Sequence, residues 1–515
     1  MPKRIKNRAV SEMRERKPKK GKANSLIKGK LSVAPSGYGF LMPEEEGPDV
    51  FIPAKYVGAA MHGDIVEVEI TEDGVDGKGP AGRIVNIVKR SRKALVGELI
   101  EGKKVRPLNK NLPEDIFING SLHGAQKGDW VEVELIPHRM KDKIHKGLVS
   151  RKLGHVGSID SDIEAVMTEL ALPAPYTDEQ DEEASTLQPR KIDRADLSSL
   201  FCVTIDPHDA KDFDDAVSIS EGKKGILEVG VHIADVASWI APGTKWDNEA
   251  RFRSFTSYLP GRTLPMLPKS LTKLISLTPD KISLAHTVII SVKKDTGEIV
   301  GAKRCHSKIK ITKRLTFEEV QSFIDGKTPE GWDGKFCAKM REVVDIALKM
   351  REHRKKIEKF LELSIPEVRV LCDFKKMEII GLERRVQRQS DNLVEDCMLA
   401  ANSKVAEELI EKSIPGLFRI HPEPDPEKFE DFYVFVSRTF GFSPGDLSSR
   451  TACNKFIESL LDDHKKPIIL GAFLRSLPRA SYLEESQVHY GLGKFKYCHF
   501  TSPIRRYPDP LVHQQ

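Results

Sequence analysis

The sequence predicts a multidomain protein in which two small N-terminal β-barrels precede one large α+β domain. Three observations support this prediction. Two segments near the N-terminus repeat with nearly constant internal spacing. A stretch rich in proline and acidic residues then interrupts the pattern. Beyond it, strand-like and helix-like patterns alternate through the rest of the 515 residues, a length that favours several domains over one.

The repeat consists of two units, which we place at residues 26–90 and 91–155. The matching segments are PDVFI at 48–52 and EDIFI at 114–118, followed by GDIVEV at 63–68 and GDWVEV at 128–133. Both units alternate apolar and polar residues, the pattern of strands with one buried face. Because there are only two copies, two successive barrels fit better than a long solenoid.

Aromatic residues occupy two predicted strands of the first unit. SGYGFL at 36–41 precedes DVFI at 49–52, which predicts that Tyr38, Phe40 and Phe51 share an exposed sheet face where RNA bases can stack. The alternative is that these rings belong to the core. The arrangement resembles a cold-shock domain of the OB-fold type. The second unit lacks the glycine–aromatic run, so the stacking prediction applies to the first.

A linker is predicted at residues 156–190, because PAPYTDEQDEEASTLQPR at 173–190 is rich in proline and acid and poor in large apolar residues. The remainder, 191–515, is expected to form one α+β domain. Apolar periodicity there predicts strands and two amphipathic helices. The expected strands are 200–205, 226–233 and 287–292, and the expected helices are 336–350 and 393–409.

The net charge of +6 is unevenly distributed. Residues 1–30 hold twelve lysines and arginines against two glutamates, a net charge of +10. This predicts a disordered basic tail over 1–25 that suits phosphate backbones; the alternative is a merely solvated tail. No apolar run reaches the roughly 18–20 residues of a membrane span, the N-terminal residues lack the apolar core of a signal peptide, and the seven cysteines form no C-x-x-C pair. We therefore expect a cytoplasmic protein with reduced thiols.

The strongest chemical signal is TIDPHDAKDFDDA at 204–216, which places five aspartates within ten positions. Such a concentration of like charge is unfavourable unless a cation compensates it, and carboxylate oxygens are the ligands that Mg²⁺ and Mn²⁺ prefer. Two such ions can activate water and stabilise a leaving oxygen in phosphoryl transfer. An EF-hand is excluded, because the required glycine and terminal glutamate are missing. A solvated acidic loop is the alternative.

The string resembles the TID-x-x-D-A-x-D-F-D-D-A signature of the ribonuclease II and ribonuclease R family. Further family segments follow in order: VHIADV at 231–236, YLPGR at 258–262, PMLP at 265–268, the helix at 392–402, LFRIH at 417–421 and HFTSPIRRYPD at 499–509. The resemblance spans roughly residues 26–513. It implies an RNA-degrading 3′-to-5′ exoribonuclease that acts on single-stranded RNA with a free 3′ end and releases 5′-mononucleotides by a two-metal mechanism.

The resemblance also implies roles for individual residues. It assigns the metal-binding, catalytic carboxylates, with two Mg²⁺ or Mn²⁺ ions, to Asp206, Asp212, Asp214 and Asp215. It makes Tyr258 the ring that stacks on the terminal base, and Arg505 the cation that grips the scissile phosphate, with Arg506 beside it on the RNA. Glu395 is expected to border the 3′-terminal nucleotide. The alternative for Tyr258 is a tyrosine of the core. For Arg505 it is a surface or structural ion pair, and for Glu395 it is a salt bridge on the helix surface.

Two competing functions are weighed against the exoribonuclease. The chain ends at Gln515, whereas family members continue through the catalytic domain into a C-terminal OB-fold, so we expect an incomplete catalytic domain. This supports a catalytically impaired RNA-binding fragment. A DNA nuclease could use the same metals. All four aspartates are present and the barrel pair favours RNA, so we predict a monomeric ribonuclease. Leu363 stands where a second stacking aromatic is expected.

Overall fold

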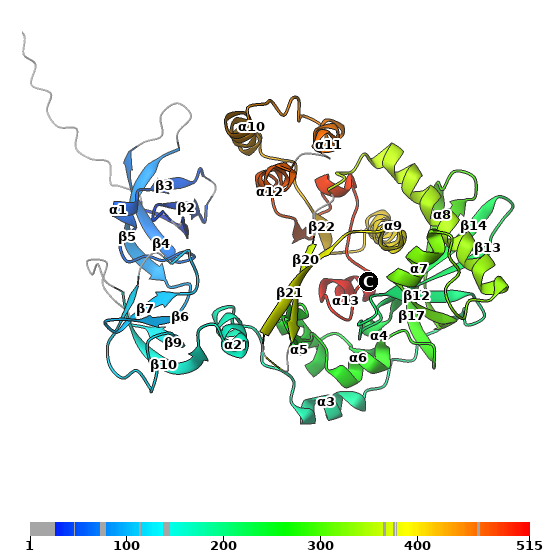
Figure 1. The fold of residues 1–515 in the computed structure, drawn as a ribbon, viewed down its shortest axis with the longest axis horizontal. Helices are drawn as coiled ribbons and strands as arrows, with labels where there is room; N and C mark the ends of the chain where they lie inside the picture. The colour runs from blue at the N-terminus through cyan, green and yellow to red at the C-terminus, as the bar shows by residue number, and fades with distance from the viewer. Residues whose placement is uncertain are drawn as a thin grey trace, which may run out of the picture. The chain divides into compact units, whose positions relative to one another are not determined.

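The computed structural model is shown in Figure 1. It describes residues 26–34, 36–45, 47–72, 79–112, 115–136, 145–363, 367–373, 376, 378–460 and 464–515. The predicted basic tail at 1–25 lies outside these residues. The chain divides into two compact units, Met1–Leu172 and Pro173–Gln515, and each is described by itself.

The first unit contains two closed five-stranded barrels, as predicted. The first barrel has the strand order β1-β2-β3-β5-β4 and the second β6-β7-β8-β10-β9, so both share one topology. A short helix, α1 (Ala54–Val57), follows β3. The strands are β1 (Ile27–Val33), β2 (Gly39–Pro43), β3 (Val50–Ile52), β4 (Ile65–Glu72), β5 (Ala81–Lys89), β6 (Ala94–Ile100), β7 (Lys104–Pro107), β8 (Ile116–Ile118), β9 (Asp129–Leu135) and β10 (Lys146–His155).

The repeated Gly-Asp pair has a structural role in both barrels. Asp64 is fully buried and accepts hydrogen bonds from the main-chain N–H of Met61 at 2.9 Å and from Arg90 at 2.8 Å. Asp129 is also buried; it accepts from the N–H of Gln126 at 2.7 Å and pairs with Lys152 at 2.6 Å. A buried carboxylate requires such hydrogen-bond partners. Each of the two therefore holds the turn that precedes its strand, β4 in the first barrel and β9 in the second.

The predicted linker at 156–190 is more ordered than expected. It contains α2 (Ile159–Glu169), which packs on the second barrel, and α3 (Asp178–Ser185), which packs on α6 (Lys269–Ile275) of the second unit. Thr177 and Gln180 form a capping box at the start of α3, and acidic residues fill its first turn. The acidity therefore favours a helix N-terminus, which carries partial positive charge.

A seven-stranded sheet organises the second unit, in the order β11-β18-β17-β14-β13-β12-β19. It confirms the three predicted strands. β12 pairs parallel with β19, and β13, β14, β17 and β18 pair antiparallel in succession. The strands are β11 (Ala195–Asp196), β12 (Cys202–Asp206), β13 (Asp215–Glu221), β14 (Ile226–Ala234), β17 (Ile282–Lys293), β18 (Ile299–Lys310) and β19 (Lys313–Thr316).

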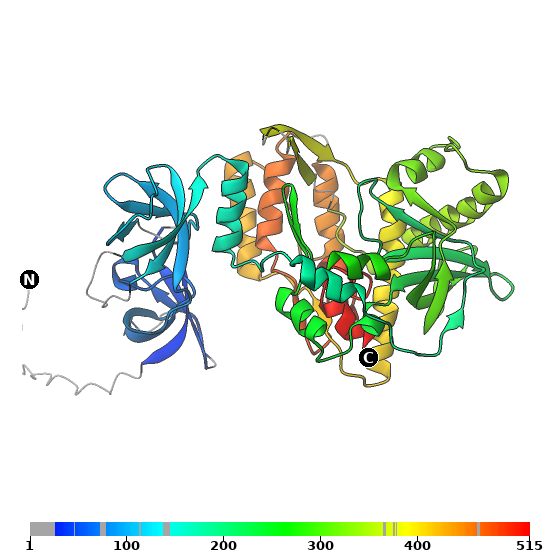
Figure 2. The ribbon, with the colours of Figure 1, turned by 90° about the horizontal axis from the view of Figure 1, so that it is seen from below.

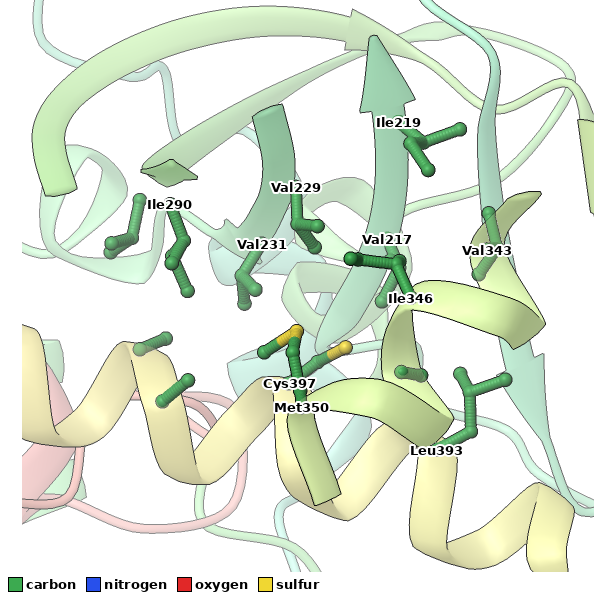
Figure 3. Packing of buried hydrophobic residues seen from close by; sticks show 14 of the residues in the cluster. Val217, Ile219, Val229, Val231, Ile290, Val343, Ile346, Met350, Leu393 and Cys397 are labelled. Atoms are coloured by element: carbon green, nitrogen blue, oxygen red, sulfur yellow. The ribbon is translucent and has the colours of Figure 1, made fainter. Parts of the chain in front are cut away.

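Two long helices, α8 (Gly334–Glu358) and α9 (Gln389–Glu411), cover one face of this sheet. Figure 3 shows the core between them, where Met350 of α8 and Cys397 of α9 meet Val217 and Val231 of the sheet. The predicted apolar faces are confirmed, since their residues are buried or packed against this core. Apolar residues at a spacing of three to four positions put that face on the sheet.

The remaining helices of the second unit are shorter than α8 and α9. Three of them, α10, α11 and α12, pack around a second apolar cluster. Figure 2 shows these helices, in orange, next to one another. Of the described helices, none combines the length and apolar content that a membrane span requires. These elements are α4 (Val236–Trp239), α5 (Lys245–Arg253), α7 (Phe317–Ile324), α10 (Pro426–Phe440), α11 (Arg450–Ser459), α12 (Lys466–Ser476) and α13 (Pro508–His513), with hairpins β15 (Ser257–Leu259) and β16 (Arg262–Leu264), β20 (Glu367–Asp373) and β21 (Glu378–Arg385), and β22 (Phe418–Ile420) and β23 (Ser481–Leu483).

A buried histidine makes the stability of this unit depend on pH. His232 of β14 lies 2.8 Å from Ser218 Oγ and 2.8 Å from Thr287 Oγ1 on the flanking strands. Burial lowers its pKa to about 4. Below about pH 6.5 the unfolded chain binds a proton that folded His232 does not bind, so stability falls as the pH drops toward 4.

We therefore expect His232 to account for about 2 kcal/mol of the stability that is lost between pH 7 and pH 5. His232→Gln keeps hydrogen-bonding atoms but does not titrate, so its unfolding free energy should decrease less over this range. Urea unfolding followed by tryptophan fluorescence measures this, because three of the four tryptophans lie in the second unit. An identical decrease in both proteins would show that His232 does not set the pH dependence.

Candidate active site

The aspartate string lies at one end of the sheet. Asp206 is the last residue of β12 and Asp215 is the first residue of β13, its antiparallel neighbour. The loop between them therefore returns the chain to the same sheet end. Asp214 immediately precedes β13 and is 7% exposed. Ile233, near the end of β14, pairs with Asp215. The pairing of β12 with β13 thus places three carboxylates at the ends of adjacent strands.

Burial raises the pKa of these three carboxyl groups, to about 7 for Asp206 and Asp215 and to about 8 for Asp214. Mutual repulsion adds to this effect: Asp214 raises the pKa of Asp206, and Asp206 raises that of Asp215. Asp206 Oδ2 is buried and has no hydrogen-bond partner among the described residues. Such a group needs protons or cations to compensate its charge.

Residues from the far end of the sequence complete this site. The main-chain N–H of Ile504 donates to Asp214 Oδ1 at 2.9 Å, and Arg505 Nε lies 3.9 Å from Asp214 Oδ2. Arg505 Nη2 donates to Ser502 Oγ at 3.0 Å, while the side chain remains 46% exposed. Arg505 is therefore anchored at one edge and open to an anionic group at the other.

Tyr258 and Asp212 lie close to the same charges. Tyr258 stands on β15 and is 61% exposed, which excludes the core alternative. Partial burial raises its pKa, and Arg505, Asp212 and Asp214 also act on it electrostatically. Burial likewise raises the pKa of Asp212, opposed by Lys211 and Arg505. The structure therefore places Tyr258, Asp212 and Arg505 within electrostatic reach of one another and of Asp214, and their roles stay predictions.

Glu395 has the contacts of a helix-surface residue. Its Oε2 accepts a hydrogen bond from Gln387 at 2.8 Å and lies 4.0 Å from Arg351. Its neighbour Asp396 is buried and pairs with Arg351 and Arg354, each at 2.9 Å. These contacts favour the alternative of a helix-surface salt bridge, and the place of Glu395 beside the 3′ nucleotide stays a prediction.

Arg506 is engaged within its own motif. Its Nη2 donates to Asp509 Oδ1 at 2.7 Å, and its side chain is 18% exposed. Asp509 is fully buried and also accepts from the main-chain N–H of Ser502 at 2.7 Å. This pairing holds the turn that presents Arg505. The predicted contact between Arg506 and RNA is untested, and the structure gives this guanidinium a structural partner.

The fit of a divalent metal follows from donor chemistry. Four carboxylates lie in this region, and burial opposes the charge on each of them. Mg²⁺ and Mn²⁺ prefer such oxygens. As arranged, however, the described residues include no group of three His, Cys, Asp or Glu side chains that could hold an ion. Ions would therefore have to draw Asp206, Asp214 and Asp215 closer together.

The aromatic residues of the first barrel form one exposed platform. Tyr38, Phe40 and Phe51 are 39%, 41% and 36% exposed, so they are not core residues. Phe40 of β2 pairs with Phe51 of β3, and their ring centroids lie 5.5 Å apart. The Tyr38 ring lies 5.9 Å from Phe40 and 5.8 Å from Phe51. We call these three rings the aromatic platform.

Three models of known protein families match parts of this chain. The RNB domain model matches residues 194–515, more than half of the chain. The Ribonuclease B OB domain model matches residues 29–87, and the Cold shock domain model matches residues 105–176. The chain belongs to the ribonuclease R family of exoribonucleases. Its RNB domain holds the aspartate site, and the aromatic platform lies in the OB domain.

Curated relatives agree with this assignment. Ribonuclease R of Aquifex aeolicus is 32% identical over 513 residues, which cover 95% of this chain and 70% of the relative. Ribonuclease R of Thermotoga maritima is 31% identical over 506 residues, covering 94% and 70%.

Solved structures share the fold at lower identity. Mycoplasma genitalium RNase R, in complex with ribose methylated single-stranded RNA, has a TM-score of 0.82 and 23% identity, covering 95% of this chain and 78% of that chain. Yeast Ssd1, a pseudonuclease, has a TM-score of 0.73 and 19% identity, covering 95% and 68%.

Sequence reasoning missed one cation of the RNB domain, Arg314. It lies on β19, opposite Thr204 of the parallel strand β12. Arg314 donates to the carbonyl oxygens of Pro207 and His208 at 3.2 and 3.1 Å, and its guanidinium lies 4.6 Å from the centre of the Phe213 ring. It thereby holds the aspartate loop and lowers the pKa of Asp206. No local motif marks it, because strand pairing alone brings it there.

Proposed function

We propose that this chain hydrolyses RNA phosphodiesters from a free 3′ end and releases 5′-mononucleotides. The observation that supports this most is the group of the buried Asp214 and the partly buried Asp206 and Asp215, with Arg505 beside Asp214. Buried like charges with raised pKa values are costly in a folded protein and are typical of functional sites.

In this proposal Asp206, Asp212, Asp214 and Asp215 hold two Mg²⁺ or Mn²⁺ ions. When bound, such ions supply a nucleophilic hydroxide at neutral pH and neutralise charge on the leaving oxygen. The main-chain N–H of Ile504 fixes the orientation of Asp214, and Arg505 is placed to bind the scissile phosphate.

The exposed ring of Tyr258 supports cleavage at the end of an RNA chain. It stands beside Arg505 and Asp214, so a base stacked on it would leave its phosphate near both groups. We infer that the terminal nucleotide of single-stranded RNA binds here. We further propose that the protein acts as a monomer in the cytoplasm, where the seven unpaired cysteines would remain reduced.

One assay tests substrate, direction and metal together. Single-stranded RNA and DNA of equal sequence, each with a free or blocked 3′ end, are incubated with the chain in Mg²⁺ and in EDTA. We expect mononucleotides only from RNA with a free 3′ end, and none in EDTA. Cleavage of the blocked RNA, equal cleavage of DNA, or activity in EDTA would each contradict one part of the proposal.

The aromatic platform is proposed to hold RNA by stacking. Replacing Tyr38, Phe40 and Phe51 together with alanine should weaken binding of long single-stranded RNA at least about tenfold, since stacking contributes about 1–3 kcal/mol per base. Cleavage of short oligomers should persist, because the aspartates lie in the other unit. Filter binding measures the effect, with Val88→Ala, an exposed apolar residue of β5, as control. Equal affinity of the triple variant and the control would assign RNA binding elsewhere.

A second candidate function is RNA binding without hydrolysis. The fold of the yeast pseudonuclease Ssd1 covers 95% of this chain, so the architecture also occurs in a protein named for lacking nuclease activity. The four aspartates favour hydrolysis in this chain. Tight RNA binding with no product in Mg²⁺ or Mn²⁺ would support this second candidate.

A further inference from the structure

A pocket of about 530 Å³ lies in the RNB domain among the β17–β18 turn, α8, α9 and residues 493–496. Its Glu298 edge is at the sheet end where β13 finishes, because Lys294 of the same turn pairs with Glu221, the last residue of β13, at 2.6 Å. The aspartate string lies at the other end of β13, where this strand begins. The seven residues of β13 span roughly 20 Å. This edge is therefore remote from the aspartate site.

Two glycines fix the walls of this pocket against α8. A Cβ atom on Gly493 would lie 2.3 Å from the carbonyl oxygen of Glu358, and one on Gly297 would lie 2.2 Å from the carbonyl carbon of Lys349. Both glycines have positive φ angles, 66° and 72°. Close main-chain packing of this kind requires glycine and gives the pocket a defined shape.

Several buried polar groups that line the pocket have no hydrogen-bond partner among the described residues. The side chain of Arg354 is 9% exposed; its Nε pairs with Asp396 Oδ1 at 2.9 Å, whereas its Nη1 lacks such a partner. Ser403 Oγ and Glu358 Oε2 likewise lack a hydrogen-bond partner among the described residues. Because buried polar groups normally have partners, this set indicates a ligand with both donors and acceptors.

The rim of the pocket carries an exposed aromatic ring and a partly exposed lysine. Phe495 is 74% exposed and stands between two lysines. Lys494 is buried and pairs with Glu358 at 2.7 Å, whereas Lys496 is half-buried. An exposed ring suits a nucleobase, and a lysine beside it suits a phosphate. The lining holds four Lys or Arg and four acidic side chains, which does not favour a simple polyanion.

We propose that this pocket binds a free mononucleotide, at a second site distinct from the aspartates. The base stacks on Phe495, and one of its N–H groups donates to Glu358 Oε2, which has no partner among the described residues. Arg354 and Ser403 donate to oxygens of the ribose or base, and Lys496 binds the phosphate. The site goes beyond the proposed cleavage reaction and does not depend on it. A nucleotide bound here would bridge α8 and α9, the two helices that cover the sheet.

The test uses AMP as probe and the intact chain in EDTA, with isothermal titration calorimetry. We expect saturable binding of one AMP, and at least tenfold weaker binding of adenosine and of inorganic phosphate. Phe495→Ala should weaken AMP binding about tenfold. Lys496→Gln should weaken it several-fold and reduce its salt dependence. Phe252→Ala, which removes a ring that is 70% exposed on α5, is the matched control and should leave the affinity unchanged.

Two results would overturn the proposal: no saturable AMP binding, or affinity that is unchanged in Phe495→Ala but lost in Tyr258→Ala, which would place AMP at the aspartate site. RNA cleavage in Mg²⁺ is measured in parallel on the same proteins. Wild-type chain that binds AMP but never cleaves RNA would contradict the proposed function alone. Chain that cleaves RNA but never binds AMP would contradict this proposal alone.

Discussion

Asp214→Asn is expected to slow RNA hydrolysis by at least about a hundredfold while RNA remains bound. Asparagine is nearly the same size, and its oxygen can still accept the hydrogen bond from Ile504. What changes is the charge of a side chain that stands beside Asp215 and Arg505. If this charge holds the metals that stabilise the transition state, the barrier rises by about 3 kcal/mol or more, and about 1.4 kcal/mol corresponds to a factor of ten.

The measurement is single-turnover cleavage of RNA with a free 3′ end in Mg²⁺, beside a filter-binding curve for the same RNA. Asp209→Asn is the matched control, because Asp209 lies in the same loop but is exposed, and it should change the rate only a few-fold. Binding by Asp214→Asn should persist or improve, since the RNA then meets less negative charge. A near-normal rate for Asp214→Asn would show that the aspartate string is not the active site.

Arg505→Lys is expected to reduce turnover at least about tenfold, with little change in RNA affinity. Arg505 is anchored to Ser502 at one edge and is half-exposed beside Asp214. Its planar guanidinium can grip two phosphate oxygens from this fixed position, whereas lysine keeps the charge but offers a single flexible ammonium. The loss should therefore fall on the chemical step.

Single-turnover rates and melting temperatures of three variants separate this role from a structural one. Arg505→Lys should melt like the wild type, because its side chain is half-exposed. Ser502→Ala removes the anchor but keeps the guanidinium, so its rate should lie between those of the wild type and Arg505→Lys. Arg506→Lys should chiefly lower the melting temperature, because it weakens a buried pair with Asp509. Wild-type turnover in Arg505→Lys would make Arg505 a structural residue.

The local pattern of the sequence was sufficient to predict several of the strands and helices. Alternating residues in the two repeats predicted the strands of both barrels, because successive side chains of a strand point to opposite faces. The same reasoning predicted the buried faces of α8 and α9 from their helical spacing. It failed at α3, where acidity and proline suggested a linker although Thr177 and Gln180 form a capping box. A turn of helix stabilised by its cap and by packing on α6 does not depend on large apolar residues.

The sequence by itself identified the aspartate string as a candidate metal site, because five carboxylates within ten positions call for a cation. The pairing of β12 with β13 then placed Asp206, Asp214 and Asp215 at one end of the sheet. Only the tertiary structure decided what faces them. Ile504 and Arg505 come from almost three hundred positions away, and Arg314 arrives through a parallel strand. Such partners depend on chain topology, which local periodicity does not encode. Arg506 and Glu395 instead take partners that are near in sequence, Asp509 and Gln387. What the tertiary structure added there is burial: it encloses Asp509 completely, and a buried carboxylate holds its cation because it cannot be solvated by water.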